Sequence, residues 1–517
     1  MPVKAKQDRN QMQVFSLESI IETNNPVRVI DLFVEVTDME GLGFRLKGKS
    51  PEGRPAYEAS TLLKLFIYGY LNRVRSSRRL ENACRTNVEL WWLLNYQRPA
   101  YRTIANFRKE NVKALQNLFI SFNRFLNGQG LFDENTVAVD GSKFGAQNSK
   151  KNNYNDRKIQ QHLKHIEKEI NNYLNQMETL DQDESMREEQ TLEIADKLDQ
   201  LANRKAKYQQ LEKELKEKRL QGQTQISTTD PDARALPKKM NIVEMSYNVQ
   251  AATEAKNNLI AAMDVINEND TYALSNISLK AKQALGKEQI NTLADKGYDT
   301  GIELQTCASA NIITYVSPKK RINAHQATGF TKDKFQYDYE ADEYICPANQ
   351  QLKTNGSWYN KNNGKFRKAY KVQHYKLPFK ICFACPLRDN CIGKSSIKNR
   401  HGKYIERSEY QEVIDQNIER VTLNKALYQT RQAIVEHPFG TIKRGWGYDF
   451  TLMTTMEKVK GEFALIFTCY NLRRTMSILE VEGLMSRLKA AKSLFYPHLE
   501  GILKIFRPFF CNRAYGR

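Results

Sequence analysis

Residues 156 to 220 form a long polar segment with neither proline nor glycine, so nothing in it interrupts a helix. Its apolar side chains recur at alternating spacings of four and three, which predicts a helix with one apolar stripe, as in a coiled coil. These residues are Ile159, Leu163, Ile166, Ile170, Tyr173, Met177 and Leu180. A polar break at 181–185 and a second stripe through Ile194, Leu198, Leu201, Tyr208 and Leu215 favour an antiparallel helical hairpin. The pattern leaves open whether the stripe closes within one chain or pairs two chains.

The charge of the chain lies outside this hairpin. The hairpin holds 13 Lys and Arg against 15 Asp and Glu, whereas the 517-residue chain holds 79 against 59, a net charge of +20. Such an excess favours a polyanionic partner, above all nucleic acid, although a merely basic protein is the alternative.

The remaining composition predicts a cytoplasmic protein. The apolar runs LFIYGYL (65–71) and FALIFTCY (463–470) are much shorter than the roughly 18 residues that span a bilayer, so no membrane segment is expected. The polar amino terminus shows no export signal. In a reducing compartment, the eight cysteines are expected to be thiols or metal ligands.

A basic corner interrupts the helical pattern of residues 17–130. Arg73, Arg75, Arg78 and Arg79 cluster around a Ser-Ser break between two expected helices. Such a corner can contact DNA, but a helical bundle with solvated arginines accounts equally well for it.

Two acidic residues follow strand-like runs in an α/β pattern. Asp140 follows the β-branched run TVAV and precedes Gly141, and Asp295 follows NTLA in the same way. Between them, residues 245–255 and 258–267 predict a β-hairpin, and 276–286 predict a helix. Carboxylates at adjacent strand ends would suit Mg²⁺ or Mn²⁺, whereas either acid alone is more often a turn or cap residue.

A third acid is needed for a two-metal phosphodiester site, and Glu436 is the candidate. It lies seven residues before Lys443, which places both on one helix face, and Lys443 could then hold a phosphate. The alternative is a solvated Glu–Lys pair.

Four cysteines lie in a strongly basic region. Cys346, Cys382, Cys385 and Cys391 are compatible with tetrahedral Zn²⁺ or with reduced, unligated thiols. Residues 353–407 hold 14 Lys and Arg against two Asp and Glu, interleaved with Trp358, Tyr359, Phe366, Tyr370 and Tyr375. This combination indicates a second DNA contact or a disordered basic loop.

In order along the chain, several of these segments resemble bacterial insertion-sequence transposases of the DDE type, specifically insertion sequence family 1182. The resembling stretches are RPAYEASTLLKLFIYGYLNRVRSSRRLENACRTNVELWWLL, RTIANFRKEN, VAVDGSKF, YNVQAATEAKNNLI, LADKGYD and VEHPFGTIKRGWGYDF. The resemblance implies an RNase H-like catalytic domain in which Asp140, Asp295 and Glu436 are the three acids. It also implies Mg²⁺-dependent cleavage and joining of transposon ends.

The spacing before Glu436 departs from a signature of related transposases, in which Tyr, Arg, Glu and Lys are separated by two, three and six residues. Tyr428, Arg431, Glu436 and Lys443 fit it, except that four residues separate Arg431 from Glu436. On a regular helix this places Arg431 about 140° from Glu436 instead of about 40°. Pro438 lacks an N–H, so a kink or helix start near Glu436 is expected.

The predicted fold class is α/β: an RNase H-like catalytic core with a helical N-terminal domain, an inserted coiled-coil hairpin and a basic, cysteine-containing insertion. The expected domains are the N-terminal DNA-binding helices (1–130), the start of the core (131–155), the hairpin (156–222), the continued core (223–317), an irregular basic insertion with a zinc knuckle (318–420) and C-terminal helices of the core (421–517). The expected DNA contacts are Arg73, Arg75, Arg78, Arg79, Lys443, Arg444 and Trp446.

The predicted function is that of a transposase that cleaves transposon-end DNA and transfers the strand. Its partners would be double-stranded DNA, namely terminal inverted repeats and target, with a homodimer in the synaptic complex at the bacterial nucleoid. The alternatives are a DNA-binding derivative without catalysis, a hydrolytic nuclease without strand transfer, and a scaffold that assembles through its hairpin.

Overall fold

The computed structural model describes most of the chain. The described residues are 12, 14–45, 56–148, 150–180, 188–220, 224–238, 242–319, 330–361, 368–392 and 397–491. Within them, no helix is long and apolar enough to cross a membrane.

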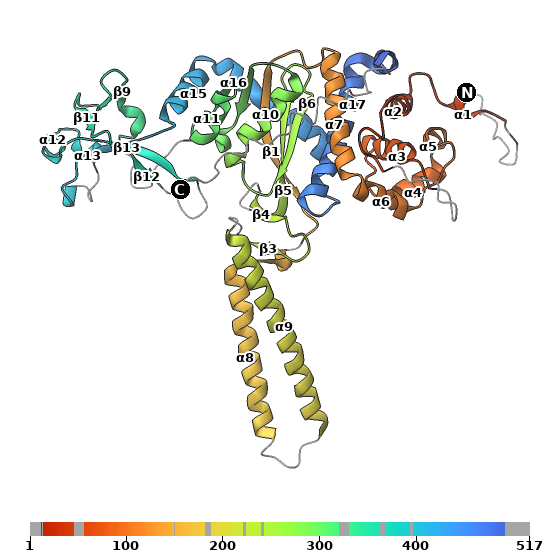
Figure 1. Ribbon diagram of the computed structural model, residues 1–517, viewed down its shortest axis with the longest axis horizontal. Helices are drawn as coiled ribbons and strands as arrows, with labels where there is room; N and C mark the ends of the chain where they lie inside the picture. The colour runs from red at the N-terminus through yellow and green to blue at the C-terminus, as the bar shows by residue number, and fades with distance from the viewer. Residues whose placement is uncertain are drawn as a thin grey trace, which may run out of the picture.

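Short helices build the N-terminal part of the protein (Figure 1). They are α1 (Leu17–Ile20), α2 (Pro26–Glu35), α3 (Ala59–Leu71), α4 (Ser77–Thr86), α5 (Val88–Leu93), α6 (Tyr101–Glu110) and α7 (Val112–Gly128). Asn25 caps α2, with its side chain accepting from the Val27 N–H, and Pro26 occupies the first helical position, where a missing N–H costs nothing. Buried side chains of these helices, such as Phe33 and Phe122, belong to the same hydrophobic cluster as those of the central sheet.

The central sheet has the strand order β4-β5-β1-β7-β8, with β6 also paired to β5. Strand β1 is antiparallel to β5 and parallel to β7, β5 is antiparallel to β6, and β7 is parallel to β8. The β5–β6 pairing confirms the predicted hairpin. The strands are β1 (Thr136–Gly145), β4 (Arg234–Pro237), β5 (Val243–Glu254), β6 (Ile260–Ile266), β7 (Ile290–Ala294) and β8 (Ile312–Val316).

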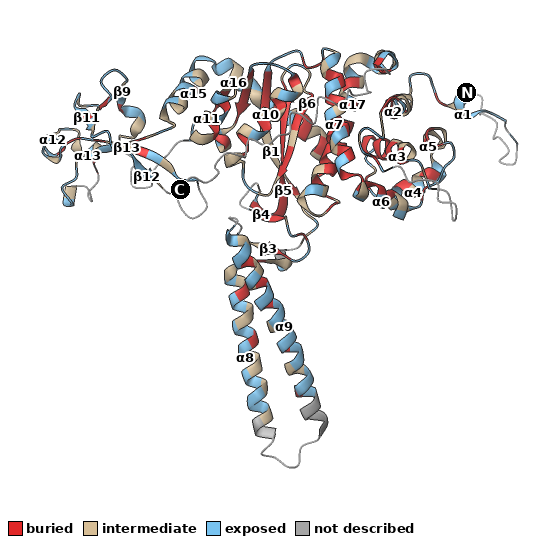
Figure 2. Cartoon of the chain, viewed as in Figure 1, coloured by how far each residue is buried: buried red, intermediate tan, exposed pale blue. Residues whose placement is uncertain are grey.

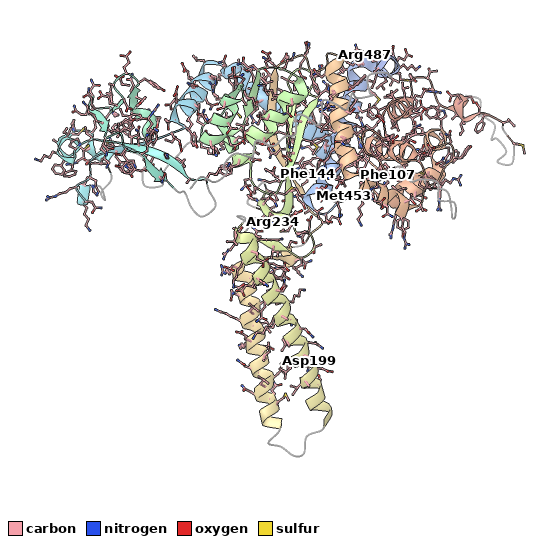
Figure 3. The ribbon with its side chains drawn as sticks, viewed as in Figure 1. Phe107, Phe144, Asp199, Arg234, Met453 and Arg487 are labelled. Atoms are coloured by element: carbon pink, nitrogen blue, oxygen red, sulfur yellow. The ribbon has the colours of Figure 1, made fainter. Side chains whose placement is uncertain are left out.

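Helices cover both faces of this sheet, so its strands are buried (Figure 2). On one face of the sheet, Val137 and Val139 belong to the main hydrophobic cluster of buried residues. This cluster also contains residues of α7, α10 (Leu274–Leu285), α11 (Gly301–Ser309) and α17 (Met456–Ala490). Phe144 of β1, labelled in Figure 3, contacts Phe463 of α17 at 4.6 Å between ring centroids. The opposite face packs Ala138 and Leu293 against α15 (Gln411–Leu423) and α16 (Lys425–Phe439).

Two long helices leave the sheet as a hairpin (Figure 1). They are α8 (Asp156–Leu180) and α9 (Glu188–Leu220), and β2 (Asn153–Tyr154) and β3 (Ile226–Ser227) pair at the base, next to the turn η1 (Lys150–Asn152). Their contact is the apolar stripe of the sequence: Ile159 and Ile166 pack with Leu201, Tyr208 and Leu215. The expected polar break at 181–185 lies outside the described residues. Because this stripe is satisfied within the chain, the hairpin needs no second copy for its core.

The region 318–420 is not irregular in its described part, contrary to the sequence-based expectation. It forms a second sheet, β12-β13-β11-β10-β9 with β14 paired to β13, over its own core around Leu352 and Tyr375. The strands are only three to seven residues long and rich in Tyr, Lys and Gln, so their period-two pattern is weak. The elements are η5 (Lys332–Lys334), β9 (Gln336–Asp338), β10 (Glu343–Ile345), β11 (Gln351–Thr354), β12 (Tyr359–Lys361), β13 (Tyr370–Lys376), α12 (Phe379–Ala384), α13 (Arg388–Cys391) and β14 (Tyr404–Ser408).

Candidate active site

Two predicted carboxylates lie just beyond the paired part of two adjacent parallel strands. The expectation that the first strand ends at Asp140 was wrong, because β1 continues to Gly145 beside β5, whereas Asp295 directly follows β7. Strands β1 and β7 pair up to Ala138 and Leu293, and Asp140 and Asp295 each follow two residues later. Their carboxylates therefore reach the same edge of the sheet. The side chain of Asp295 also caps the short helix η4 (Lys296–Tyr298), accepting from the Gly297 N–H at 2.7 Å.

A third carboxylate, Asp270, lies at this edge. It begins η3 (Asp270–Tyr272), directly after β6, and its Oδ1 accepts from Asn248 Nδ2 and Gln250 Nε2, each at 2.8 Å. Both amides come from β5. Gly141 makes room for the group, because a Cβ there would lie 2.4 Å from Asp270 Oδ1. Neighbouring strand residues point to opposite faces, so Asp270 lies across β1 from Asp140.

Burial and neighbouring charge perturb Asp140. The pKa of its carboxyl is raised to about 6, mainly because burial removes water from the charged form. The Gly141 N–H and the Arg431 guanidinium oppose this rise, and the charges of Asp295 and Asp270 add to it. A perturbed acid at the rim of an α/β sheet is typical of a functional site.

The buried side chain of Tyr298 holds Gln250 beside the site. Its hydroxyl donates to Gln250 Oε1 at 2.5 Å, and its ring is fully buried. Burial, together with the carboxylates of Asp270, Asp140 and Asp295, raises its pKa far above the ordinary range. The hydroxyl therefore stays protonated and fixes the Gln250 amide that holds Asp270.

The structure does not bring Glu436 into this group. Its carboxylate is exposed and accepts from Gln432 Nε2 at 2.9 Å, one helical turn earlier. The side of α16 that packs on the sheet presents Ile434 and Val435, and Arg431 lies one turn before Val435, within electrostatic reach of Asp140. The predicted angular offset between Arg431 and Glu436 thus persists.

The helix does not start at Glu436, which corrects one part of the expectation drawn from Pro438, and the expected kink stays a prediction. Helix α16 runs through Pro438 to Phe439 and then widens into the π-helical segment η6 (Gly440–Gly445). Among the described residues, no group of three or more His, Cys, Asp and Glu side chains is placed to hold a metal ion. Asp140 and Asp295 fit a hard cation in chemistry and position, whereas Glu436 does not join them in this conformation.

Two of the predicted DNA contacts are buried and must be removed from that set. Arg75 is 7% exposed, donates to the Phe450 carbonyl at 2.8 Å and pairs with Glu462 at 3.5 Å. Trp446 is 5% exposed and belongs to the main hydrophobic cluster. Sequence spacing could not show this, because the partners of Arg75 lie more than 370 residues away.

The other predicted contacts have an exposed or partly exposed position. Arg78 and Arg79 line a groove of about 340 Å³ with Asn82 and Thr86 of α4, and Arg73 is exposed at the corner before it. Lys443 is half-buried over the Phe144 ring and donates to the Lys143 carbonyl at 2.7 Å, and Arg444 is exposed.

The four cysteines of the predicted zinc knuckle line one small cavity of about 30 Å³. Cys346 Sγ accepts from the Ala348 and Gln350 N–H groups, and Cys382 Sγ accepts from the Lys403 N–H, each at 3.3 Å. Burial raises the pKa values of the Cys382 and Cys391 thiols. Since the described side chains form no ready metal site, zinc stays a prediction.

Comparison with known proteins identifies two transposase segments. Residues 15–110 match a family model described as a transposase domain, DUF772, and residues 345–476 match one described as a transposase DDE domain. These matches support a DDE-type transposase. The second segment contains Glu436 but neither Asp140 nor Asp295, and neither match resolves the particular insertion-sequence family.

Curated proteins and solved structures give no further information about the site. No curated protein matches the chain. A cryo-EM structure of a piggyBac transposase synaptic complex with hairpin DNA aligns over 96% of this chain and 87% of its own, at 9% identity and a TM-score of 0.32. At that score the two structures differ too much for the likeness to inform the site.

Sequence reasoning missed Asp270 and the residues that hold it. Asp270 lies in the turn-like run NEND, whose composition is common to many loops. Asn248 and Gln250 of β5 alternate with apolar residues, and the structure buries both amides completely. Buried amides of this kind need partners, and here the partner is Asp270.

Proposed function

We propose that the chain is a DDE transposase with an RNase H-like core, acting on the ends of a mobile DNA element. The observation that carries the proposal is the pair Asp140 and Asp295, each two residues beyond the last pair of the parallel strands β1 and β7. The sheet supports it, because its order β6-β5-β1-β7-β8, with only β5 antiparallel to β1, is the strand order of that fold. The matches to two transposase models supply the substrate class.

Asp140 and Asp295 would hold Mg²⁺ or Mn²⁺, with Glu436 as the predicted third ligand. A bound divalent cation supplies Lewis acidity at the scissile phosphate and lowers the pKa of an attacking water. Asp140 must be ionised for this role, and with its pKa raised to about 6 the carboxyl is ionised at neutral pH even before a cation binds. Arg431 adds positive charge beside Asp140, where a phosphate would also enter.

The reaction would consist of two in-line phosphoryl transfers. Water attacks the phosphorus at the element end, the P–O3′ bond breaks, and the 3′-hydroxyl of the element is released. That hydroxyl then attacks a phosphodiester of target DNA, forms the new P–O bond and displaces the target 3′-oxygen. Neither transfer requires a covalent protein intermediate.

The partners follow from this reaction. The element's terminal inverted repeats and the target are double-stranded DNA, and the exposed Arg73, Arg78 and Arg79 around the α4 groove offer a cationic contact for its backbone. Two ends must be held together, so we expect a homodimer in the synaptic complex, at the bacterial nucleoid.

The test compares Asp140→Asn and Asp295→Asn with Asp133→Asn. Asp133 is an exposed acid just before β1 that pairs with Lys256 at 2.5 Å, so it serves as a matched control outside the site. Cleavage and joining of a duplex bearing the element's terminal repeats are measured with Mg²⁺, and DNA affinity is measured in parallel. We expect both site variants to lose cleavage with DNA binding retained, and the control to cleave normally.

The outcomes separate the alternatives. Cleavage retained in either site variant overturns the assignment of Asp140 and Asp295. Cleavage without joining by the unmodified chain identifies a hydrolytic nuclease, and DNA binding without cleavage identifies an inactive derivative. Glu436→Gln tests the third acid by itself.

A further inference from the structure

One face of the second sheet carries aromatic rings that take no part in its core. In β13 and β14, Tyr375 and Ile405 point into the core, whereas His374 and Tyr404 belong to the opposite face. Tyr359 of β12 joins them, because its ring stacks on His374 at 4.7 Å between centroids and 12° between planes. His374 in turn contacts Tyr404 at 5.8 Å, so a row of rings crosses three strands.

This row is unusually exposed for aromatic residues. Tyr359 is 39% exposed and Tyr404 55%, and Trp358, directly before β12, is 49% exposed. Clustered apolar surface of this kind usually marks a contact with a partner.

The charge around the rings decides the kind of partner. Lys361 and Lys376 flank the row, and Lys353, which pairs with Glu343 at 3.8 Å, adds a third cation 70% exposed to solvent. A second acid on this face, Glu406, is paired with Lys361 and lies 3.8 Å from His374 Nε2. Residues 353–407 carry 14 basic against two acidic residues, and this excess favours an anionic ligand.

We propose that this face, defined by Trp358, Tyr359, His374 and Tyr404, binds single-stranded DNA by stacking on unpaired bases. In a duplex the faces of the bases are covered by their neighbours, so exposed rings gain nothing from it beyond charge. In a single strand the base faces are free, while the adjacent lysines neutralise the phosphates.

This binding does not depend on the catalytic assignment, because it needs neither Asp140 nor a divalent cation. The experiment therefore uses the full-length Asp140→Asn chain without added Mg²⁺. The probe is a fluorescently labelled oligothymidylate of about 15 nucleotides, which spans the site sizes usual for such surfaces. Affinity is read by fluorescence anisotropy, with a labelled duplex of equal length in parallel.

The variants separate stacking from simple apolar contact. Tyr359→Leu and Tyr404→Leu keep apolar bulk without a ring, whereas Tyr359→Phe and Tyr404→Phe keep the ring. Tyr96→Leu is the control, since Tyr96 is 53% exposed in the N-terminal helices and stacks on Trp91. All variants should retain the wild-type melting temperature, because the altered side chains lie at the surface.

We expect each leucine variant of the face to weaken oligothymidylate binding by at least about fivefold, the lower range for one stacked base. The phenylalanine variants and the control should stay within about twofold of the parent chain. Equal losses for Leu and Phe, an equal loss on the duplex, or no loss would each overturn the proposal. So would at least tenfold tighter binding of an oligouridylate of the same length, which would make RNA the ligand.

Discussion

Replacing Gly141 with alanine tests how tightly the site is built behind Asp140. Gly141 follows Asp140 in β1 and pairs with Gln250 of β5. A methyl group at this position would lie 2.1 Å from Gln250 Nε2, 2.4 Å from Asp270 Oδ1 and 2.7 Å from Asn248 Oδ1. None of these distances is tolerable, so the two amides or Asp270 must move.

The cost can be worked from what must move. Overpacking a well-filled position costs about 1–3 kcal/mol. Each amide hydrogen bond to a carboxylate contributes about 1.5–3 kcal/mol, although water recovers part of this when Asp270 swings outward. We therefore expect Gly141→Ala to lower the free energy of unfolding by about 2–4 kcal/mol.

Gly145→Ala is the matched control, since it makes the same change four residues later in β1. A Cβ at Gly145 would meet its nearest atom, Phe450 Cβ, at 3.6 Å, which is an ordinary contact. We expect no loss of stability there, and even a gain of about 0.4–1 kcal/mol if alanine restricts the unfolded chain.

Urea unfolding followed by circular dichroism provides the measurement for both variants. A double variant, Gly141→Ala with Asp270→Ala, adds a second test, because removing the Asp270 carboxylate removes one partner of the clash. The double variant should then lose less than the sum of the two single changes. If the Gly141 and Gly145 variants are equally stable, the predicted clash of a Cβ at Gly141 does not occur. If the losses of the two single variants simply add in the double variant, the clash does not involve Asp270.

Three further changes test other parts of the molecule. Asp140 has its pKa raised to about 6, so the stability it contributes is full below about pH 4 and is lost as the pH rises through 6. Asp140→Asn should therefore be more stable than the unmodified chain at pH 7.5 by on the order of 2–3 kcal/mol, and no more stable at pH 4; equal urea midpoints at pH 7.5 would contradict this. If the four cysteines hold zinc, elemental analysis should find about one zinc per chain and much less in Cys385→Ser, whereas a metal-free native chain would leave them as thiols. Glu462→Gln should cost about 3–5 kcal/mol in thermal or urea unfolding, because it removes the carboxylate facing the buried Arg75 and Arg108, and a loss below 1 kcal/mol would show that this ion pair matters little.

Asp140 and Asp295 could be predicted because their signal is local. Each follows a short β-branched or apolar run and precedes a glycine or a helix start, a pattern that can be read from a few residues. Only Asp295 directly follows the end of its strand, because β1 continues past Asp140 to Gly145. The hairpin was equally readable, since its stripe repeats over many turns. Asp270 was not, because its importance comes from two amides on another strand.

The sequence could not show which of its polar side chains are buried. Arg75 looks identical to Arg73, Arg78 and Arg79 along the chain, yet it packs beneath the Tyr448 ring at 4.2 Å and pairs with Glu462. The short strands of the second sheet were missed for a different reason. Its core rests on a few residues, such as Leu352 and Tyr375, set among lysines and polar residues that hide the alternation.

The rotation of α16 about its own axis decides which of its polar side chains faces Asp140. Ile434 and Val435 are buried and fix which side of the helix meets the sheet. Arg431 lies four residues before Val435, about 40° away, and so faces Asp140, whereas Glu436 is turned about 100° outward. A three-residue gap between Arg431 and the glutamate would place both on the inner face. The extra residue between Arg431 and Glu436 therefore turns the Arg431 guanidinium toward Asp140 and the Glu436 carboxylate away from it. To bring Glu436 to Asp140 and Asp295, α16 would have to rotate about its axis, and the buried side chains of Ile434 and Val435 oppose that rotation.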